Sequence, residues 1–285
     1  MVLGGNSSAL LLLPAGFLLN EAVIGVDVMV QKIVAIGGGE IGRPKEGGGR
    51  YPVETISIDK EIIRLSGKKH PKVLFLPTAS GDSSGYASVV EEHFGKRLGC
   101  IVEPLFLRKE KFSKEELEKK VFSSDIIYVG GGNTFKMLRT WKRTGFSKIL
   151  ARAREKGIVL SGVSAGALCW CRFGNSDSRK FSNKNADYIK VNCLGFVNVF
   201  LCPHYDVEAE RQTSLKKMMK RIPGVAIALE NCSALEVVGE KARIITSKKS
   251  TSAYKIFWSK GKFFKQKLQK NKWFELGELL SKKRI

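Results

Sequence analysis

The segment Gly162-Val163-Ser164-Ala165-Gly166 gives the strongest indication of the fold in this 285-residue chain. The preceding run, Gly157-Ile158-Val159-Leu160-Ser161, is short and apolar like a buried strand, and Ala167-Leu168-Cys169-Trp170 is typical of the opening of a helix. A serine between two glycines at a strand-to-helix turn is the pattern of a nucleophile elbow. Small neighbours there let the hydroxyl stand clear on a tight, strained turn. Ser164 is therefore the candidate nucleophile, although ordinary turns use the same residue types.

On both sides of this segment, short apolar runs alternate with helical patterns, as expected for βαβ units and a mostly parallel sheet. We expect strands at 32–36, 73–76, 101–107, 125–129, 157–161, 196–202 and 225–229. Helices are expected at 54–66, 86–98, 113–122, 133–143, 146–156 and 207–221, with Ser113 and Glu116 forming a capping box. The ranges 233–246 and 253–267 are typical of hairpins. The predicted fold is a three-layer α/β/α structure with edge hairpins at the C-terminus.

The organisation of the chain indicates one catalytic domain over residues 29–285, because no repeat, low-complexity tract or linker interrupts that stretch. We interpret residues 1–28 as an N-terminal extension that is upstream sequence from a misplaced start codon or a weakly ordered appendage. The apolar stretch 9–19 is too short to span a bilayer. A secretory signal would need an early positive charge, and the first lysine is Lys32. The expected location is cytoplasmic.

The chain carries a formal net charge of +22. More than half of it comes from residues 241–285, where fourteen Lys or Arg face only Glu275 and Glu278. These cations stand singly among polar and apolar residues, without an arginine-rich run or an RNA-binding motif. They indicate a solvated surface, so we expect neither a nucleic-acid nor a membrane partner. The six cysteines form no Cys-x-x-Cys pair and several lie in apolar runs, which is typical of reduced, buried thiols.

A serine nucleophile needs a base, and the chain has three histidines. His70 precedes Pro71 in a lysine-rich loop, and His93 follows two glutamates on a helix expected to be exposed. His204 comes directly after an apolar strand, where open α/β sheets place functional residues. His204 is therefore the predicted catalytic base.

The base in turn needs a group that orients it. Asp177, in a polar segment after the elbow, is the preferred acid, and Asp206 and Glu230 remain alternatives. Asp206 lies close to His204 in sequence, but neighbours along a chain rarely point at one another.

An acyl-transfer site also needs donors for the oxyanion. The backbone amide of Ala165 is one candidate. The second is expected from Gly131 or Gly132 in a glycine-rich loop that follows an apolar strand and opens a helix, and Asn133 at the end of this loop is a further candidate for binding the oxyanion or the substrate.

Five motifs in this order resemble those of the peptidase S51 family, which contains dipeptidase E and cyanophycinase. They are Ile36-Gly37-Gly38-Gly39-Glu40, Leu76-Pro77-Thr78-Ala79-Ser80, Tyr128-Val129-Gly130-Gly131-Gly132-Asn133-Thr134, Gly162-Val163-Ser164-Ala165-Gly166-Ala167 and Cys202-Pro203-His204-Tyr205-Asp206. Ser233-Ala234-Leu235-Glu236-Val237 fits the same family. The resemblance runs from about residue 30 to the C-terminus.

The resemblance implies a serine hydrolase on a class I glutamine amidotransferase-like, flavodoxin-like fold. Ser164 would be the nucleophile and His204 the base, with an acid of the Asp177 loop completing the triad. It also implies a short peptide as substrate, no metal or cofactor, and a chain that could form a homodimer. Leu168 stands where dipeptidase E has Asn, and the segment from Trp170 to Ser178 resembles an uncharacterised bacterial branch. This departure leaves the side-chain specificity open.

Three other functional classes compete with a peptidase. Gly37–Gly42 satisfies the Gly-x-Gly-x-x-Gly pattern of dinucleotide binding, but the following stretch through Pro52 is too rich in Gly and Pro to open a helix at once. A ligand-binding protein without activity on the same scaffold, or a hydrolase of a non-peptide amide, stays an alternative.

Overall fold

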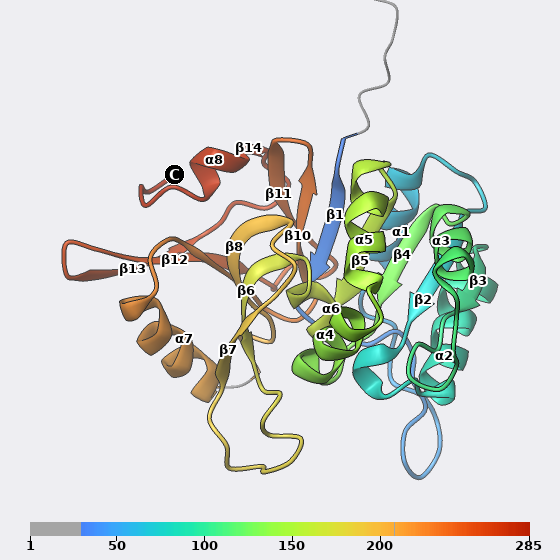
Figure 1. Ribbon diagram of the computed structural model, residues 1–285. Helices are drawn as coiled ribbons and strands as arrows, with labels where there is room; N and C mark the ends of the chain where they lie inside the picture. Colours follow the sequence, from blue (N-terminus) through green and yellow to red (C-terminus); the bar gives the residue numbers. More distant parts are fainter. Residues whose placement is uncertain (1–29, 208) are drawn as a thin grey trace, which may run out of the picture.

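The protein is an α/β structure, seen here in a computed structural model that describes residues 30–285 except residue 208 (Figure 1). The expected extension over residues 1–28 lies outside the described residues. The α/β class and the alternation of strands and helices are as predicted, but the strands are divided between two sheets.

The first sheet has the order β14-β11-β10-β1-β5-β4-β2-β3, with β1, β5, β4, β2 and β3 running parallel. Its strands are β1 (Lys32–Ile36), β2 (Lys72–Leu76), β3 (Ile101–Pro104), β4 (Ile126–Val129), β5 (Val159–Val163), β10 (Ser233–Val238), β11 (Lys241–Thr246) and β14 (Phe274–Glu275). The strands β10 and β11 pair antiparallel, and β10 lies antiparallel beside β1.

Helices cover both faces of the parallel strands, because alternate apolar residues of each strand point to opposite faces. One face packs against α1 (Ile56–Ser66), α2 (Ser84–Val90) and the π-helical turn Glu91–Arg97, which continues α2. The other face packs against α3 (Lys114–Phe122), α4 (Thr134–Arg143) and α5 (Phe146–Glu155). The predicted capping box of Ser113 and Glu116 begins α3.

The second sheet has the order β13-β12-β9-β8-β6-β7. Its strands are β6 (Cys171–Ser176), β7 (Ile189–Asn192), β8 (Val197–Cys202), β9 (Ala226–Leu229), β12 (Ala253–Ser259) and β13 (Lys262–Lys267). One face of this sheet joins the same apolar core as α3, α4 and α5, and the other packs on α7 (Ala209–Arg221). A short helix, α8 (Leu276–Leu279), follows β14. None of the helices within the described residues is long and apolar enough to cross a membrane.

Several expected elements begin or end a few residues from their predicted bounds, and two local expectations fail more fully. The helix after the elbow, α6, spans only Ala165–Leu168, and the chain turns through Trp170 into β6, a strand that the sequence pattern did not predict. His93 is fully buried rather than exposed. Its Nε2 lies 2.8 Å from Oδ2 of Asp59, a buried carboxylate that compensates the burial of the ring.

Candidate active site

Ser164 stands on a strained turn between β5 and α6. Its backbone has φ of 56° and ψ of −112°, a conformation that L-residues rarely adopt. Its N–H donates to the carbonyl of Ile36 at 3.0 Å, so the end of β1 fixes the turn. This geometry presents the side chain at the C-terminal edge of the sheet, as expected for a nucleophile elbow.

The glycines of the elbow are required by close backbone packing. A Cβ at Gly162 would lie 2.6 Å from the carbonyl oxygen of Val129, and one at Gly166 only 2.0 Å from the same atom. Both separations are far below van der Waals contact, so no side chain fits at either position.

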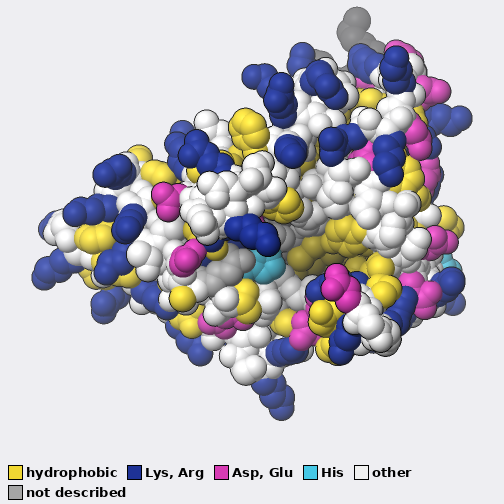
Figure 2. All heavy atoms as spheres, turned by 90° about the horizontal axis from the view of Figure 1, so that it is seen from below, with side chains coloured by type: hydrophobic (Ala, Val, Ile, Leu, Met, Phe, Trp, Pro, Cys, Tyr) yellow, Lys and Arg dark blue, Asp and Glu magenta, His cyan; other side chains and the backbone are white. Residues whose placement is uncertain are grey.

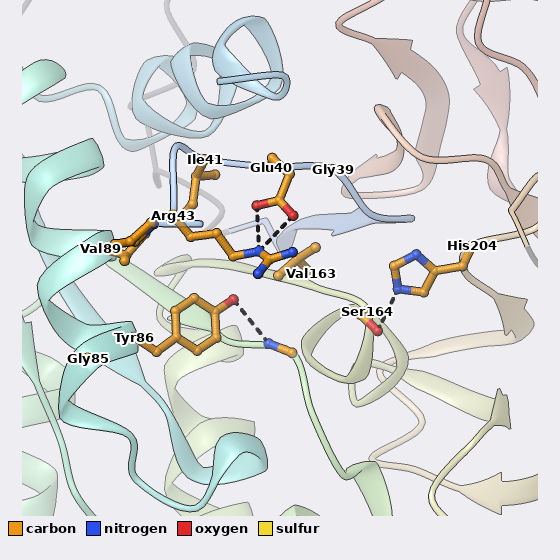
Figure 3. A pocket seen from close by; sticks show the side chains of 12 residues that line it. Gly39, Glu40, Ile41, Arg43, Gly85, Tyr86, Val89, Val163, Ser164 and His204 are labelled. Atoms are coloured by element: carbon orange, nitrogen blue, oxygen red, sulfur yellow. Dashed lines mark hydrogen bonds and ion pairs between the residues drawn. The ribbon is translucent and has the colours of Figure 1, made fainter. Parts of the chain in front are cut away.

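His204 reaches Ser164 from the second sheet. It follows β8, and its Nε2 lies 2.9 Å from the Ser164 Oγ (Figure 3). The backbone at His204 has φ of 52°, and its N–H donates to the carbonyl of Gly37 at 3.0 Å. The structure thus brings together the nucleophile and base that the sequence predicted. The distance is that of a base able to take the serine proton.

The orienting position behind His204 is taken by an amide, Asn231, which the sequence analysis missed. Its Oδ1 lies 2.7 Å from Nδ1 of His204. With Oδ1 as acceptor, Nδ1 carries the proton and Nε2 keeps a lone pair directed at Ser164, the tautomer that a base requires. Asn231 comes two residues after β9, and β8 and β9 are parallel neighbours that end at one edge. The prediction that both strands end at the same edge of a sheet could have identified Asn231 as a neighbour of His204.

The three predicted acids have other contacts. Asp177 lies 3.8 Å from the guanidinium of the buried Arg211 and is not brought to His204. Asp206 accepts the backbone N–H of Asn231 at 2.9 Å, so it supports the orienting residue rather than the histidine. Glu230 accepts the N–H of Ser252 at 2.6 Å and the hydroxyl of Tyr254 at 3.0 Å.

The glycine motif after β1 belongs to this same site. A Cβ at Gly38 would lie 2.0 Å from Oδ1 of Asn231 and 2.5 Å from the ring of His204. The motif therefore leaves room for the histidine and its partner. The next helix, α1, begins only at Ile56, so no helix opens directly after the glycines as a dinucleotide site requires.

Two candidate oxyanion donors, the backbone amides of Ala165 and Gly131, belong to residues next to Ser164. Among the described residues, the N–H of Ala165 has no hydrogen-bond partner. A Cβ at Gly131 would lie 3.5 Å from Cβ of Ser164, and the N–H of Gly131 donates to the Tyr86 hydroxyl at 3.3 Å. Gly132 packs against the backbone of Ala79 instead, because a Cβ at Gly132 would lie 2.4 Å from the Ala79 carbonyl oxygen.

The side chain of Asn133 makes two structural hydrogen bonds. Its Oδ1 accepts the N–H of Lys136 at 2.9 Å and caps α4, while its Nδ2 donates to the carbonyl of Ser178 at 3.0 Å. Its side chain therefore holds α4 against the segment after β6.

A cavity of about 480 Å³ opens beside Ser164. Figure 2 shows the face at the C-terminal strand edge, where hydrophobic side chains gather in a hollow next to a histidine. The cavity lies between the loop after β1 and helix α2, and its lining residues are Gly39, Glu40, Ile41, Arg43, Pro44, Gly85, Tyr86, Val89, Gly131, Val163, Ser164 and His204.

The model of peptidase family S51 matches residues 47–245. The chain belongs to peptidase family S51. It is 32% identical over 229 residues to the uncharacterized peptidase YgaJ of Bacillus subtilis (strain 168), covering 80% of this chain and 92% of that protein. It is 32% identical to the uncharacterized peptidase Lmo0363 of Listeria monocytogenes, over 55% of this chain and 73% of the relative.

The fold has a counterpart among solved structures. A peptidase from an acI-B1 Actinobacterium superimposes with a TM-score of 0.64, covering 87% of this chain and 98% of the other at 19% identity. This S51 peptidase thus has the architecture of a known peptidase, with a serine and a histidine at hydrogen-bond distance in its cavity.

Proposed function

We propose that this S51 peptidase hydrolyses short peptides through a Ser164–His204–Asn231 site and an acyl-enzyme. The observation that carries the proposal is the 2.9 Å contact between His204 Nε2 and the Ser164 Oγ on a strained elbow. A cavity of about 480 Å³ is within the range of small-molecule sites, which favours a substrate of one or a few residues.

The mechanism follows from this arrangement. Ser164 attacks the carbonyl carbon of the peptide while Nε2 of His204 takes its proton. The amides of Ala165 and Gly131 receive the oxyanion, and His204 then donates the proton to the leaving amine. Water, activated by the same histidine, hydrolyses the acyl-enzyme. Asn231 acts as a positioning residue, since it holds the tautomer and ring orientation of His204.

The function is tested with a panel of dipeptides, hydrolysed by the wild type and by Ser164→Ala side by side. We expect the substitution to lower kcat by about 10³-fold or more while the circular dichroism spectrum stays unchanged. His204→Ala should be similarly inactive. The double variant should be no worse than either single variant, because the two groups act as a unit.

Activity near the wild-type level in Ser164→Ala would refute the nucleophile. Absence of serine-dependent hydrolysis across the panel, from folded protein, would refute the peptide substrate. It would favour a non-peptide amide or a ligand-binding role at the same cavity.

A further inference from the structure

We propose that the cavity beside Ser164 is the pocket for the residue on the acyl side of the scissile bond, and that it selects an apolar side chain. This inference rests on the proposed peptidase function and names its substrate class. It follows from the direction of the cavity, the side chains that line it and the pairing of its charges.

The direction of the cavity assigns the side of the substrate. His204 must reach the leaving amine to protonate it, so the leaving group lies on the histidine side of Ser164. In Figure 3, Ile41, Tyr86 and Val89 lie on the other side of Ser164, away from His204. The acyl part of the substrate therefore extends toward these residues.

The far part of this cavity is apolar. Ile41 and Val89 are 8% and 9% exposed, and they face the space together with Pro44, Val163 and the ring of Tyr86. A side chain entering here loses its water without gaining hydrogen bonds to these groups. An aliphatic or aromatic side chain is stabilised by that transfer, and a charged one is destabilised.

The charges at the cavity already neutralise one another. Among its lining residues, Arg43 and Glu40 are the pair of opposite charge, with Nε of Arg43 at 2.8 and 3.0 Å from the two Glu40 carboxylate oxygens. The Arg43 guanidinium also lies 4.1 Å from the centroid of the Tyr51 ring. The negative charge of Glu40 repels a second carboxylate beside Arg43, so an acidic first residue is disfavoured.

The test is a set of dipeptides Xaa-Gly with Xaa as Leu, Phe, Ala, Asp or Lys, with kcat/KM measured for the wild type. We expect Leu and Phe to exceed Asp and Lys in kcat/KM by about 30-fold or more, since an apolar pocket discriminates by about 10- to 200-fold for one missing methylene group. Equal or better hydrolysis of Asp-Gly or Lys-Gly would overturn the pocket assignment while leaving the serine peptidase intact.

A substitution at the charged pair tests the reason for the preference. Glu40→Gln leaves the guanidinium of Arg43 unbalanced, so kcat/KM for Asp-Gly relative to Leu-Gly should rise by about 10-fold. Glu110→Gln, at an exposed position outside the cavity, is the matched control and should leave that ratio unchanged. An unchanged ratio in Glu40→Gln would overturn the role of the pair.

Binding to the inactive Ser164→Ala protein separates this proposal from the chemistry. Calorimetric titration with Leu-Gly and Asp-Gly should give tighter binding of Leu-Gly, whether or not the wild type hydrolyses either peptide. Preference for Asp-Gly, or binding of neither peptide at millimolar concentration, would overturn the apolar pocket. If the wild type hydrolyses neither peptide while Ser164→Ala still binds Leu-Gly more tightly than Asp-Gly, only the proposed reaction is refuted.

Discussion

Nδ1 of His204 lies 2.7 Å from Oδ1 of Asn231, so a neutral amide occupies the position behind the proposed base. An amide can fix the tautomer of the ring, but it stabilises the imidazolium formed during catalysis less than a carboxylate does. The nearby carboxylate of Asp206 contacts the backbone of Asn231 instead of the ring.

Replacing the amide by its isosteric acid should therefore improve catalysis. In Asn231→Asp we expect kcat to rise by about 10-fold, since a carboxylate stabilises the imidazolium formed during catalysis more strongly than a neutral amide does. The new carboxylate favours protonated His204 and raises its pKa, so the acid limb of the pH–kcat profile should move to higher pH. Steady-state kinetics from pH 5 to 9 measure both effects.

Asn231→Ala is the companion variant. It should lower kcat by about 10- to 100-fold with little change in KM, because substrate contacts are retained while the ring loses its orientation. Wild-type kcat in this variant, with no gain in Asn231→Asp, would remove Asn231 from the mechanism.

The Tyr86 hydroxyl accepts the Gly131 N–H at 3.3 Å, on an amide proposed to receive the oxyanion. Substrate must displace this hydroxyl, and a typical hydrogen bond contributes about 0.5–1.5 kcal/mol. Tyr86→Phe should thus raise kcat/KM by about 2- to 12-fold. The ring remains, so the preference between Leu-Gly and Asp-Gly should not change. A lowered kcat/KM would mean that the hydroxyl assists the oxyanion site.

Gly166→Ala should damage both stability and activity. Its methyl group would lie 2.0 Å from the Val129 carbonyl oxygen, so β4 and the elbow must separate. Overpacking of this kind costs about 1–3 kcal/mol, measurable as a lower urea midpoint. Gly277→Ala, in α8 with open space around it, is the matched control and should be neutral or slightly stabilising. Equal urea midpoints for the two variants would contradict the crowding at the elbow.

The loop that borders the cavity is tied down by Glu54. One of its oxygens accepts the Glu40 N–H at 3.1 Å and the other pairs with Lys248 at 2.5 Å. The hydrogen bond from Lys248 lowers the pKa of Glu54 below its ordinary value of 4.5. Because the pKa of Glu54 is lower in the folded than in the unfolded state, its ionised carboxylate stabilises the folded protein at pH values above the unfolded-state pKa. This stabilisation is lost as the pH falls through the folded-state pKa.

Glu54→Gln should therefore have a lower Tm than the wild type at pH 7, and the difference should shrink as pH falls below the ordinary pKa of 4.5. Lys248→Gln should show the same pattern, and the double variant should lose no more than either single one. Thermal melts of the wild type and the variants at several pH values measure these differences in Tm. A difference in Tm that does not shrink at all between pH 5 and pH 3 would show that the contribution does not come from this ionised pair.

The sequence predicted those structural features that depend on residues close together in the chain. The strand at 32–36 coincides with β1, the capping box begins α3, and the elbow serine has its strained backbone. These features arise from hydrophobic periodicity, helix capping and turn-forming residues within a few positions, so they can be predicted from a short stretch of sequence.

Features set by distant contacts were not predicted. Asn231 lies 27 positions from His204, and its side chain is not an acid, so a search for triad carboxylates passed over it. His93 follows two glutamates but faces Asp59 on another helix, 34 positions away. The strand β6 depends on pairing with β7 and β8, which the short apolar runs around Trp170 do not reveal.

Ser164, the proposed nucleophile, follows β5 of one sheet, and His204, the proposed base, follows β8 of the other. The 2.9 Å contact between them therefore depends on how the two sheets pack against each other. A misplacement of about 1 Å is enough to reduce catalysis by 10²-fold. Enzyme turnover is consequently the most sensitive reporter of loosening between the sheets. On gentle heating, turnover should decrease at temperatures where the far-ultraviolet circular dichroism of the strands and helices is still unchanged.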